Sequence, residues 1–156
     1  MNAADERAAV PATGSDEAGG PADGVATGYV AYSGDAVAMG RTIRALAEKG
    51  VAIGAQVRYP DGLALGQESF YLDDVALCDV FLAQVATIAA LAESAGSKLA
   101  AVRCHGALAM DVSSDERTAQ VVARTLYRLF PGVSLVCVAA SPGGGVARDC
   151  GVSVVP

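Results

Sequence analysis

The sequence has a single histidine, no tryptophan and few charged residues. His105 is the only histidine among 156 residues, so a metal site built from several histidines is excluded. Charged residues make up 18% of the chain, below the ~25% of an ordinary globular domain. The net charge is −6, and no basic cluster is present. We therefore expect no nucleic-acid partner.

The cysteine pattern and the hydrophobic runs exclude further classes of protein. No Cys-x-x-Cys pair occurs among the four cysteines, which argues against a zinc ribbon. We expect Cys78 and Cys137 to be small core residues. The first residues lack the basic and apolar regions of a signal peptide, and no apolar run approaches the ~20 residues of a membrane span. These absences predict a cytoplasmic protein with reduced thiols, no bound metal and no membrane partner.

Hydrophobic residues make up 53% of the chain, but they show no periodicity at its start. Residues 1–24 combine proline, glycine and acidic residues without periodicity, which is typical of a disordered tail. Residues 25–156 form the predicted domain. Strands are expected at residues 25–32, 51–55, 99–102, 133–140 and 152–155.

Helix signals separate these strands. Asp35 has the place of a helix cap, and Gly50 ends the helix that follows it. Asp73 or Asp74 begins a second helix, and Gly96 closes it. Ser113 and Glu116 have the spacing of a capping box before a third helix. A glycine-rich turn and a short helix then lead to Cys150. The second helix has an apolar stripe of Leu77, Phe81, Val85, Ile88 and Ala92.

Nearly continuous apolar strands that alternate with helices predict a parallel sheet covered on both faces. Five strands are too few for a closed eight-stranded barrel. The sheet is therefore open, or it is part of a barrel that another chain completes or that is left incomplete. Ligands of such folds bind beyond the carboxyl ends of the strands. Polar segments gather at that edge, at residues 32–35, 56–61, 103–106 and 140–145.

His105 and Arg103 are the main catalytic candidates at this edge. An imidazole can act as a general acid or base, and the alternative is a strand-end histidine that hydrogen-bonds a loop carbonyl. The Arg103 guanidinium can bind a carboxylate or phosphate through two hydrogen bonds, and the alternative is an ion pair with Asp35 or Asp61. Cys104 adjoins His105, but adjacent strand residues point to opposite faces, which argues against a Cys–His nucleophile.

Other polar residues at this edge also allow a structural interpretation. The cap position of Asp35 and the Tyr-Pro-Asp-Gly turn around Asp61 both favour structural roles. Gln56 can hydrogen-bond an amide but cannot act as a general base. The glycine-rich residues 141–148 follow a strand and open a helix. A flexible turn is favoured there over weak anion binding, because the spacing of a phosphate loop is absent.

Three blocks of the chain resemble, in order, the family of 5-oxoprolinase A subunits, also called the LamB/YcsF family. They are Gly34-Asp35 with Arg41-Thr-Ile, residues 50–61 with Tyr-Pro-Asp, and residues 102–108 with Arg-Cys-His-Gly-Ala-Leu. The resemblance covers about residues 25–156 and implies a distorted β/α barrel related to polysaccharide deacetylases. It also implies ATP-dependent opening of the 5-oxoproline lactam to glutamate, together with partner subunits.

The chain departs from the family pattern at polar positions. The family's Gly-Ala-His strand end is Gly-Ala-Gln56 here, and its Lys-Pro-His-Gly is Arg103-Cys-His-Gly. The arginine pair after the Tyr-Pro-Asp loop is Gln67-Glu68. The first Asp-Leu-Asn strand and the C-terminal part of the pattern have no counterpart. Because polar groups are lost while the scaffold is kept, we predict divergence to another cyclic-amide or cyclisation-type reaction in specialised metabolism.

We therefore predict an α/β fold, an incomplete or distorted (β/α) barrel of parallel strands of the glycoside hydrolase or deacetylase type. The expected substrate is a small molecule, a lactam or a carboxylate, and ATP is implied by the family resemblance alone. The alternative is a non-catalytic pseudoenzyme or structural subunit, which associates with itself or with partner subunits through its open sheet edge. We assign catalytic roles to His105, Arg103 and Asp61, and substrate-binding roles to Gln56, Tyr59, Asp35 and Gly106.

Overall fold

The computed structural model describes residues 26–60, 66–138 and 140–156, so the predicted tail at residues 1–24 lies outside it. Two helices stand between the third and fourth strands, and one helix stands between the other neighbouring strands. The strands are β1 (Thr27–Ala31), β2 (Ala52–Val57), β3 (Leu99–Cys104), β4 (Ser134–Val136) and β5 (Val154–Val155). The helices are α1 (Ala36–Glu48), α2 (Asp74–Ser94), α3 (Ala107–Ser114), α4 (Glu116–Leu129) and α5 (Pro142–Asp149).

All five strands are parallel and stand in the sheet in the order of the sequence, β1-β2-β3-β4-β5. A doubly wound sheet would reverse its strand order at a switch point, whereas a β/α barrel keeps the sequential order found here. Among the described residues, β1 and β5 each have a single neighbour, so the sheet is not closed. The prediction of an open parallel α/β sheet is confirmed.

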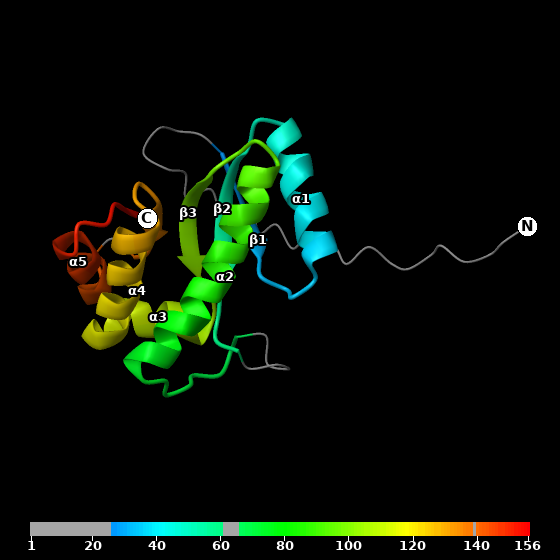
Figure 1. Ribbon diagram of the computed structural model, residues 1–156. Coiled ribbons are helices and arrows are strands. Elements are labelled where there is room, and N and C mark those ends of the chain that lie inside the picture. The colour runs from blue at the N-terminus through cyan, green and yellow to red at the C-terminus, as the bar shows by residue number, and fades with distance from the viewer. Residues whose placement is uncertain (1–25, 61–65, 139) are drawn as a thin grey trace, which may run out of the picture.

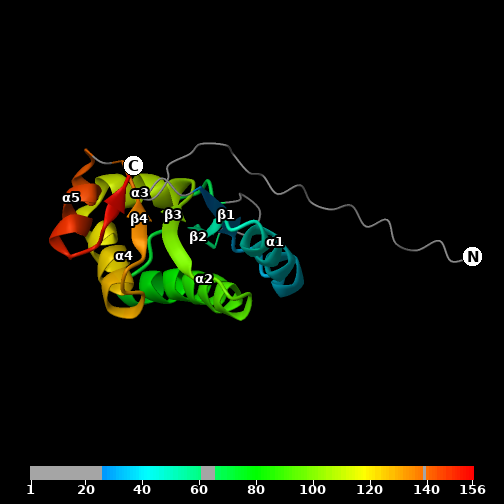
Figure 2. The same ribbon diagram turned by 90° about the horizontal axis from the view of Figure 1, so that it is seen from above.

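Helices cover one face of the sheet (Figures 1 and 2), so the prediction of a sheet covered on both faces is wrong for the described part of the chain. α1 and α2 pack on β1, β2 and β3, and α4 lies beside α2 (Figures 1 and 2). α3 follows β3 directly and lies where the arrowhead of β3 points (Figure 1). The strand side chains that are fully buried are Ile53, Ala55, Val57, Ala101, Val102 and Leu135.

The predicted stripe of α2 is confirmed, because all five of its apolar side chains are buried. However, the expectation that no apolar segment approaches the length of a membrane span is wrong. With 21 residues, α2 is long and apolar enough to cross a membrane by length and composition. Core helices can have the same properties, and α2 packs against β2, β3, α1 and α4.

The predicted limits of the first two helices are confirmed. The Asp35 carboxylate accepts hydrogen bonds from the backbone N–H groups of Val37 and Ala38 at 3.0 Å each, and Asp73 caps α2 through Ala76. Glycines with positive φ, Gly50 and Gly96, follow the two helices. Short polar side chains at helix starts and glycines at helix ends act on neighbouring residues only, so the helix limits that they predict do not depend on tertiary contacts.

The predicted capping box at Ser113 and Glu116 is wrong, and α3 was not predicted at all. Ser113 lies inside α3, and its hydroxyl donates to the carbonyl of Ala109. The cap of α4 is Asp115, whose extended backbone turns the chain and whose carboxylate accepts from the N–H of Thr118 at 2.8 Å. α3 is a helix of eight residues, too short for periodicity to reveal.

Four further element predictions need correction. β2 and β3 extend to Val57 and Cys104, because the parallel ladder between them continues through these residues. The strand predicted at 133–140 shortens to β4, since β5 offers only two residues to pair with it. The glycine-rich segment is not a flexible turn but the first turn of α5, capped by the hydroxyl of Ser141.

Candidate functional site

Arg103 and Gln56 form the centre of the predicted site. Their strands pair so that the two residues stand directly opposite each other and share a face of the sheet. The guanidinium of Arg103 donates a hydrogen bond of 2.6 Å from Nη2 to Oε1 of Gln56. The bond fixes one edge of the guanidinium and leaves the amide group of Gln56 available as a donor. The structure therefore brings two of the predicted site residues together.

Tyr29 is a third member of this cluster, and the sequence analysis did not single it out. The guanidinium of Arg103 stacks on the ring of Tyr29, with the Cζ atom of Arg103 4.4 Å from the ring centroid. The register places Tyr29 opposite Gly54, and a Cβ atom at Gly54 would stand 2.4 Å from the ring. Burial raises the pKa of Tyr29, and the nearby Arg103 charge partly opposes this shift. Gly54 thus makes room for a ring that stacks on Arg103.

A cavity of about 420 Å³ opens beside Arg103. Apart from Arg103 and Ser113, the side chains that line it are apolar or thiol groups, so the Arg103 guanidinium borders largely apolar side chains. Burial raises the pKa of the Cys104 thiol to about 12, and Cys137 contributes to the shift. A protonated, buried thiol is a poor nucleophile. The lining residues are Arg103, Cys104, Ala109, Val112, Ser113, Val136, Cys137, Val138 and Pro156.

Two other predicted residues lie at the end of β3. The backbone N–H of His105 donates to the carbonyl of Val57 at 2.8 Å, so the main chain continues the ladder beyond the strand. Gly106 caps α3 with a φ of +61°. A Cβ atom there would stand 2.1 Å from the carbonyl oxygen of Gly66, so the position has no room for a side chain.

Of the remaining predicted residues, Asp35 and Tyr59 lie apart from Arg103. Asp35 is exposed, and its carboxylate caps α1, so the ion pair with Arg103 that the sequence allowed is not formed. Asp61 lies outside the described residues. Tyr59 is only 2% exposed and lines a different pocket.

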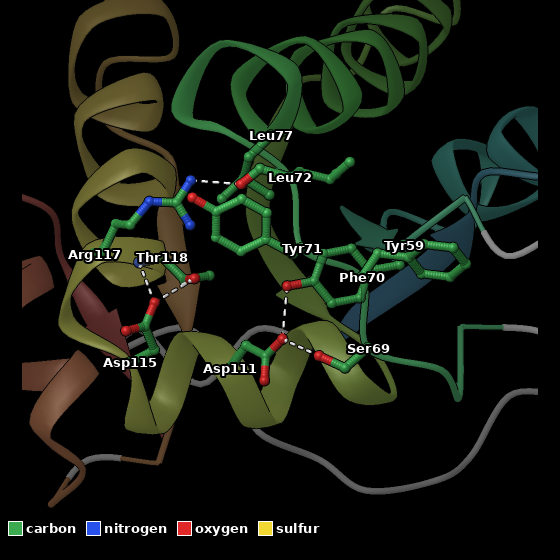
Figure 3. A pocket seen from close by; sticks show the side chains of 10 residues that line it. All are labelled: Tyr59, Ser69, Phe70, Tyr71, Leu72, Leu77, Asp111, Asp115, Arg117 and Thr118. Carbon is green, nitrogen blue, oxygen red and sulfur yellow. Dashed lines mark hydrogen bonds between the residues drawn. The ribbon is translucent and has the colours of Figure 1, made fainter.

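That second pocket, which we call the Asp111 pocket, has a volume of about 320 Å³ (Figure 3). The Asp111 carboxylate accepts hydrogen bonds of 2.7 Å from the hydroxyls of Tyr59 and Ser69. Burial, followed by the bond to Asp111, raises the pKa of Tyr59, so this hydroxyl stays a donor. The lining residues are Tyr59, Ser69, Phe70, Tyr71, Leu72, Leu77, Asp111, Asp115, Arg117 and Thr118.

The glycine-rich segment at the start of α5 does not fit an ATP phosphate loop. The N–H of Gly144 donates to the Ser141 hydroxyl, and that of Gly145 donates to the Ser141 carbonyl. Gly143 packs against the backbone of Val112 rather than facing an open cradle. No group of three or more His, Cys, Asp or Glu side chains in the described part of the chain could hold a metal ion.

The family is decided by comparison with known proteins. The profile of the LamB/YcsF family matches residues 22–156, which is most of the chain. The chain belongs to the LamB/YcsF family. The resemblance noted in the three sequence blocks is thereby confirmed.

Curated LamB/YcsF relatives are named as A subunits of 5-oxoprolinase. The chain is 37% identical over 130 residues to the 5-oxoprolinase A subunit of Syntrophobacter fumaroxidans, covering 83% of this chain and 51% of that protein. It is 31% identical over 131 residues to a 5-oxoprolinase A subunit of Agrobacterium fabrum, covering 84% of this chain and 51% of that protein. The chain thus spans about half the length of these relatives.

A solved structure has the same fold. The crystal structure of a lactam utilization protein from Thermus thermophilus superimposes with a TM-score of 0.78 at 26% sequence identity. The match covers 83% of this chain and 54% of that chain. The LamB/YcsF chain described here therefore has the α/β architecture found in about half of the Thermus thermophilus protein.

Proposed function

We propose that this LamB/YcsF protein binds a small cyclic amide that carries a carboxylate, with Arg103 as the carboxylate-binding residue. The observation that carries the proposal is the guanidinium of Arg103, held by Gln56 and by the Tyr29 ring at the wall of the 420 Å³ cavity. The homology to 5-oxoprolinase A subunits supports 5-oxoproline as the ligand class. The largely apolar walls suit the methylene groups of a lactam ring.

Arg103 and Gln56 of the cluster have proposed tasks, and the tasks of His105 and Asp61 are proposed from the sequence analysis alone. The guanidinium of Arg103 has free N–H groups for a carboxylate, which it binds with a geometry that a lysine does not offer. The amide nitrogen of Gln56 donates to the lactam carbonyl, since its oxygen is occupied by Arg103. His105 transfers a proton to or from the reacting amide. Asp61 positions the substrate in this proposal.

Replacing Arg103 by glutamine is expected to weaken the binding of 5-oxoproline at least tenfold. A charge-assisted hydrogen bond contributes about 1.5–3 kcal/mol, which corresponds to roughly 10–150-fold in the dissociation constant. 2-Pyrrolidone has the same lactam ring without the carboxylate, so its weaker binding is expected to fall by a smaller factor in Arg103→Gln, through loss of the bond that orients Gln56. Isothermal titration calorimetry of both ligands measures the difference.

Arg124→Gln is the matched control, because Arg124 is exposed on α4 and outside the cavity lining. Its titrations are expected to match those of the unchanged protein. An equal loss of affinity for both ligands in Arg103→Gln would refute a carboxylate-binding role for Arg103. No binding of either ligand to the unchanged protein would favour the non-catalytic alternative.

We further propose that the reaction has diverged from the opening of 5-oxoproline to glutamate. Gln56 stands where the family pattern has a histidine and cannot transfer a proton, and Arg103 stands where the pattern has a lysine. Incubation with 5-oxoproline and ATP, with and without the partner subunits of a curated relative, is expected to release no glutamate above background. Glutamate release that depends on ATP and on His105 would instead establish the opening of 5-oxoproline as the reaction. It would not affect the conclusion drawn from the binding experiment with Arg103→Gln.

A further inference from the structure

The Asp111 pocket has a different chemistry from the cavity beside Arg103. It lies between the segment before α2, helix α3 and the first turn of α4, and it is open enough to admit a small molecule (Figure 3). Its volume of about 320 Å³ is in the range of ligand pockets. No residue lines both cavities, so a ligand here would not occupy the proposed lactam site.

Negative charge is in excess in the Asp111 pocket. Asp111 uses Oδ2 to accept from Tyr59 and Ser69, whereas its Oδ1 accepts no hydrogen bond from the described residues. Asp115 adds a second carboxylate, and its hydrogen bonds with Thr118 lower its pKa, so that it is ionised at neutral pH. Figure 3 shows both carboxylates on the same side of the pocket.

The positive charge of the pocket is already neutralised. Arg117 Nε lies 2.7 Å from Oδ1 of Asp74, and Nη2 donates to the carbonyl of Leu72. Its guanidinium also stacks on the ring of Tyr71, 5.2 Å from the centroid. An anionic ligand would have to compete with Asp74 for Arg117 and approach two carboxylates, which is electrostatically unfavourable.

Aromatic side chains form much of the remaining wall. Tyr59, Phe70 and Tyr71 line the pocket, and Tyr71 is 88% exposed at its rim. The faces of aromatic rings attract cations, and a nearby carboxylate adds to this attraction. The described residues provide no group of three acidic, histidine or cysteine side chains for a metal ion, so the aromatic walls favour an organic cation.

We propose that the Asp111 pocket binds a small organic ammonium compound, with Asp111 pairing with the ammonium group and the aromatic rings enclosing its apolar body. Three probes of one shape test this: benzylammonium, benzyl alcohol and benzoate. Titration of the isotope-labelled full chain, followed by amide NMR shifts, is expected to give a dissociation constant for benzylammonium at least tenfold below that for benzyl alcohol. Benzoate is expected to bind most weakly, and the shifts should centre on residues 69–72 and 111–118.

Asp111→Asn keeps the acceptor oxygen for Tyr59 and Ser69 but removes the charge, and it is expected to weaken benzylammonium binding about tenfold. Asp79→Asn, on the exposed face of α2, is the matched control and should bind as the unchanged protein does. Tyr71→Ala removes an exposed ring, so it tests the aromatic wall even if Asp111→Asn fails to fold. Benzyl alcohol binding as tightly as benzylammonium, or benzoate binding more tightly, would overturn the proposal. Because Arg103→Gln should leave benzylammonium binding unchanged, this outcome is independent of the proposed lactam site.

Discussion

Replacing Gly106 by alanine is expected to lower the free energy of unfolding by about 4 kcal/mol. The backbone of Gly106 has φ +61° and ψ −137°, a conformation that residues with a Cβ atom rarely adopt. The added Cβ would also stand 2.1 Å from the backbone oxygen of Gly66, which accepts the hydrogen bond from the N–H of Ala107. The strain and the clash add, because neither can be relieved without moving the start of α3.

Gly34→Ala separates the two contributions. Gly34 also has positive φ, at +78°, but no atom outside its immediate neighbours lies within 4 Å of the Cβ position. This variant should therefore lose only about 1–2 kcal/mol, from backbone strain alone. Thermal unfolding compares the two variants, at roughly 2–4 °C per kcal/mol for a chain of this size. Equal losses in both would show that the contact with Gly66 contributes nothing.

Gly143→Ala is expected to cost about 3 kcal/mol, although its backbone is helical. A Cβ atom at Gly143 would lie 1.7 Å from the carbonyl oxygen of Val112, so α5 and α3 touch backbone to backbone. Separating the two helices would displace Val112 and Ser113, which line the cavity beside Arg103. The variant should therefore melt roughly 6–12 °C lower.

Gly145→Ala is the control in the same helix. Its Cβ position is open, so the change should stabilise the protein by about 0.5–1 kcal/mol through the better helix propensity of alanine. In the same denaturation experiment, Gly143→Ala is expected to lower the free energy of unfolding and Gly145→Ala to raise it. A destabilised Gly145→Ala, or a neutral Gly143→Ala, would contradict the close contact between α3 and α5.

Local signals in the sequence predicted the strands and most of the helices. The stripe of α2 and the caps at Asp35 and Asp73 depend on neighbours within one or two turns, so the sequence contains all the information needed to place them. The position of Asp115, by contrast, depends on where α3 ends. Since α3 itself was not predicted, the cap was placed two residues too early at Ser113.

The candidate site was predictable only in part. Arg103 and Gln56 were both singled out, because polar side chains near the ends of apolar strands stand out in the sequence. Their contact depends on the register of β2 against β3, which the sequence does not reveal. Tyr29 was missed for the same reason, since its place over Gly54 and under Arg103 requires the pairing of three strands.

The separation of the two pockets also depends on tertiary structure. Tyr59 and Arg103 were assigned to one site because both follow strands at the same edge of the sheet. In the folded chain, Tyr59 is buried and donates to Asp111, a residue of the unpredicted helix α3. The short α3 therefore contributes Asp111 to a pocket that no motif in the sequence indicated.

The sequence by itself determined the alternation of strands and helices and the polar residues near the strand ends, and its motifs carried the resemblance to the family. These features follow from composition, periodicity and short motifs, which act over a few residues. The tertiary structure decided which polar residues meet, which glycines are steric necessities and where the two cavities lie. Those properties arise from strand register and from helix contacts between residues far apart in the chain, such as Gly106 with Gly66 and Gly143 with Val112. Contacts of this kind exist only once the chain has folded.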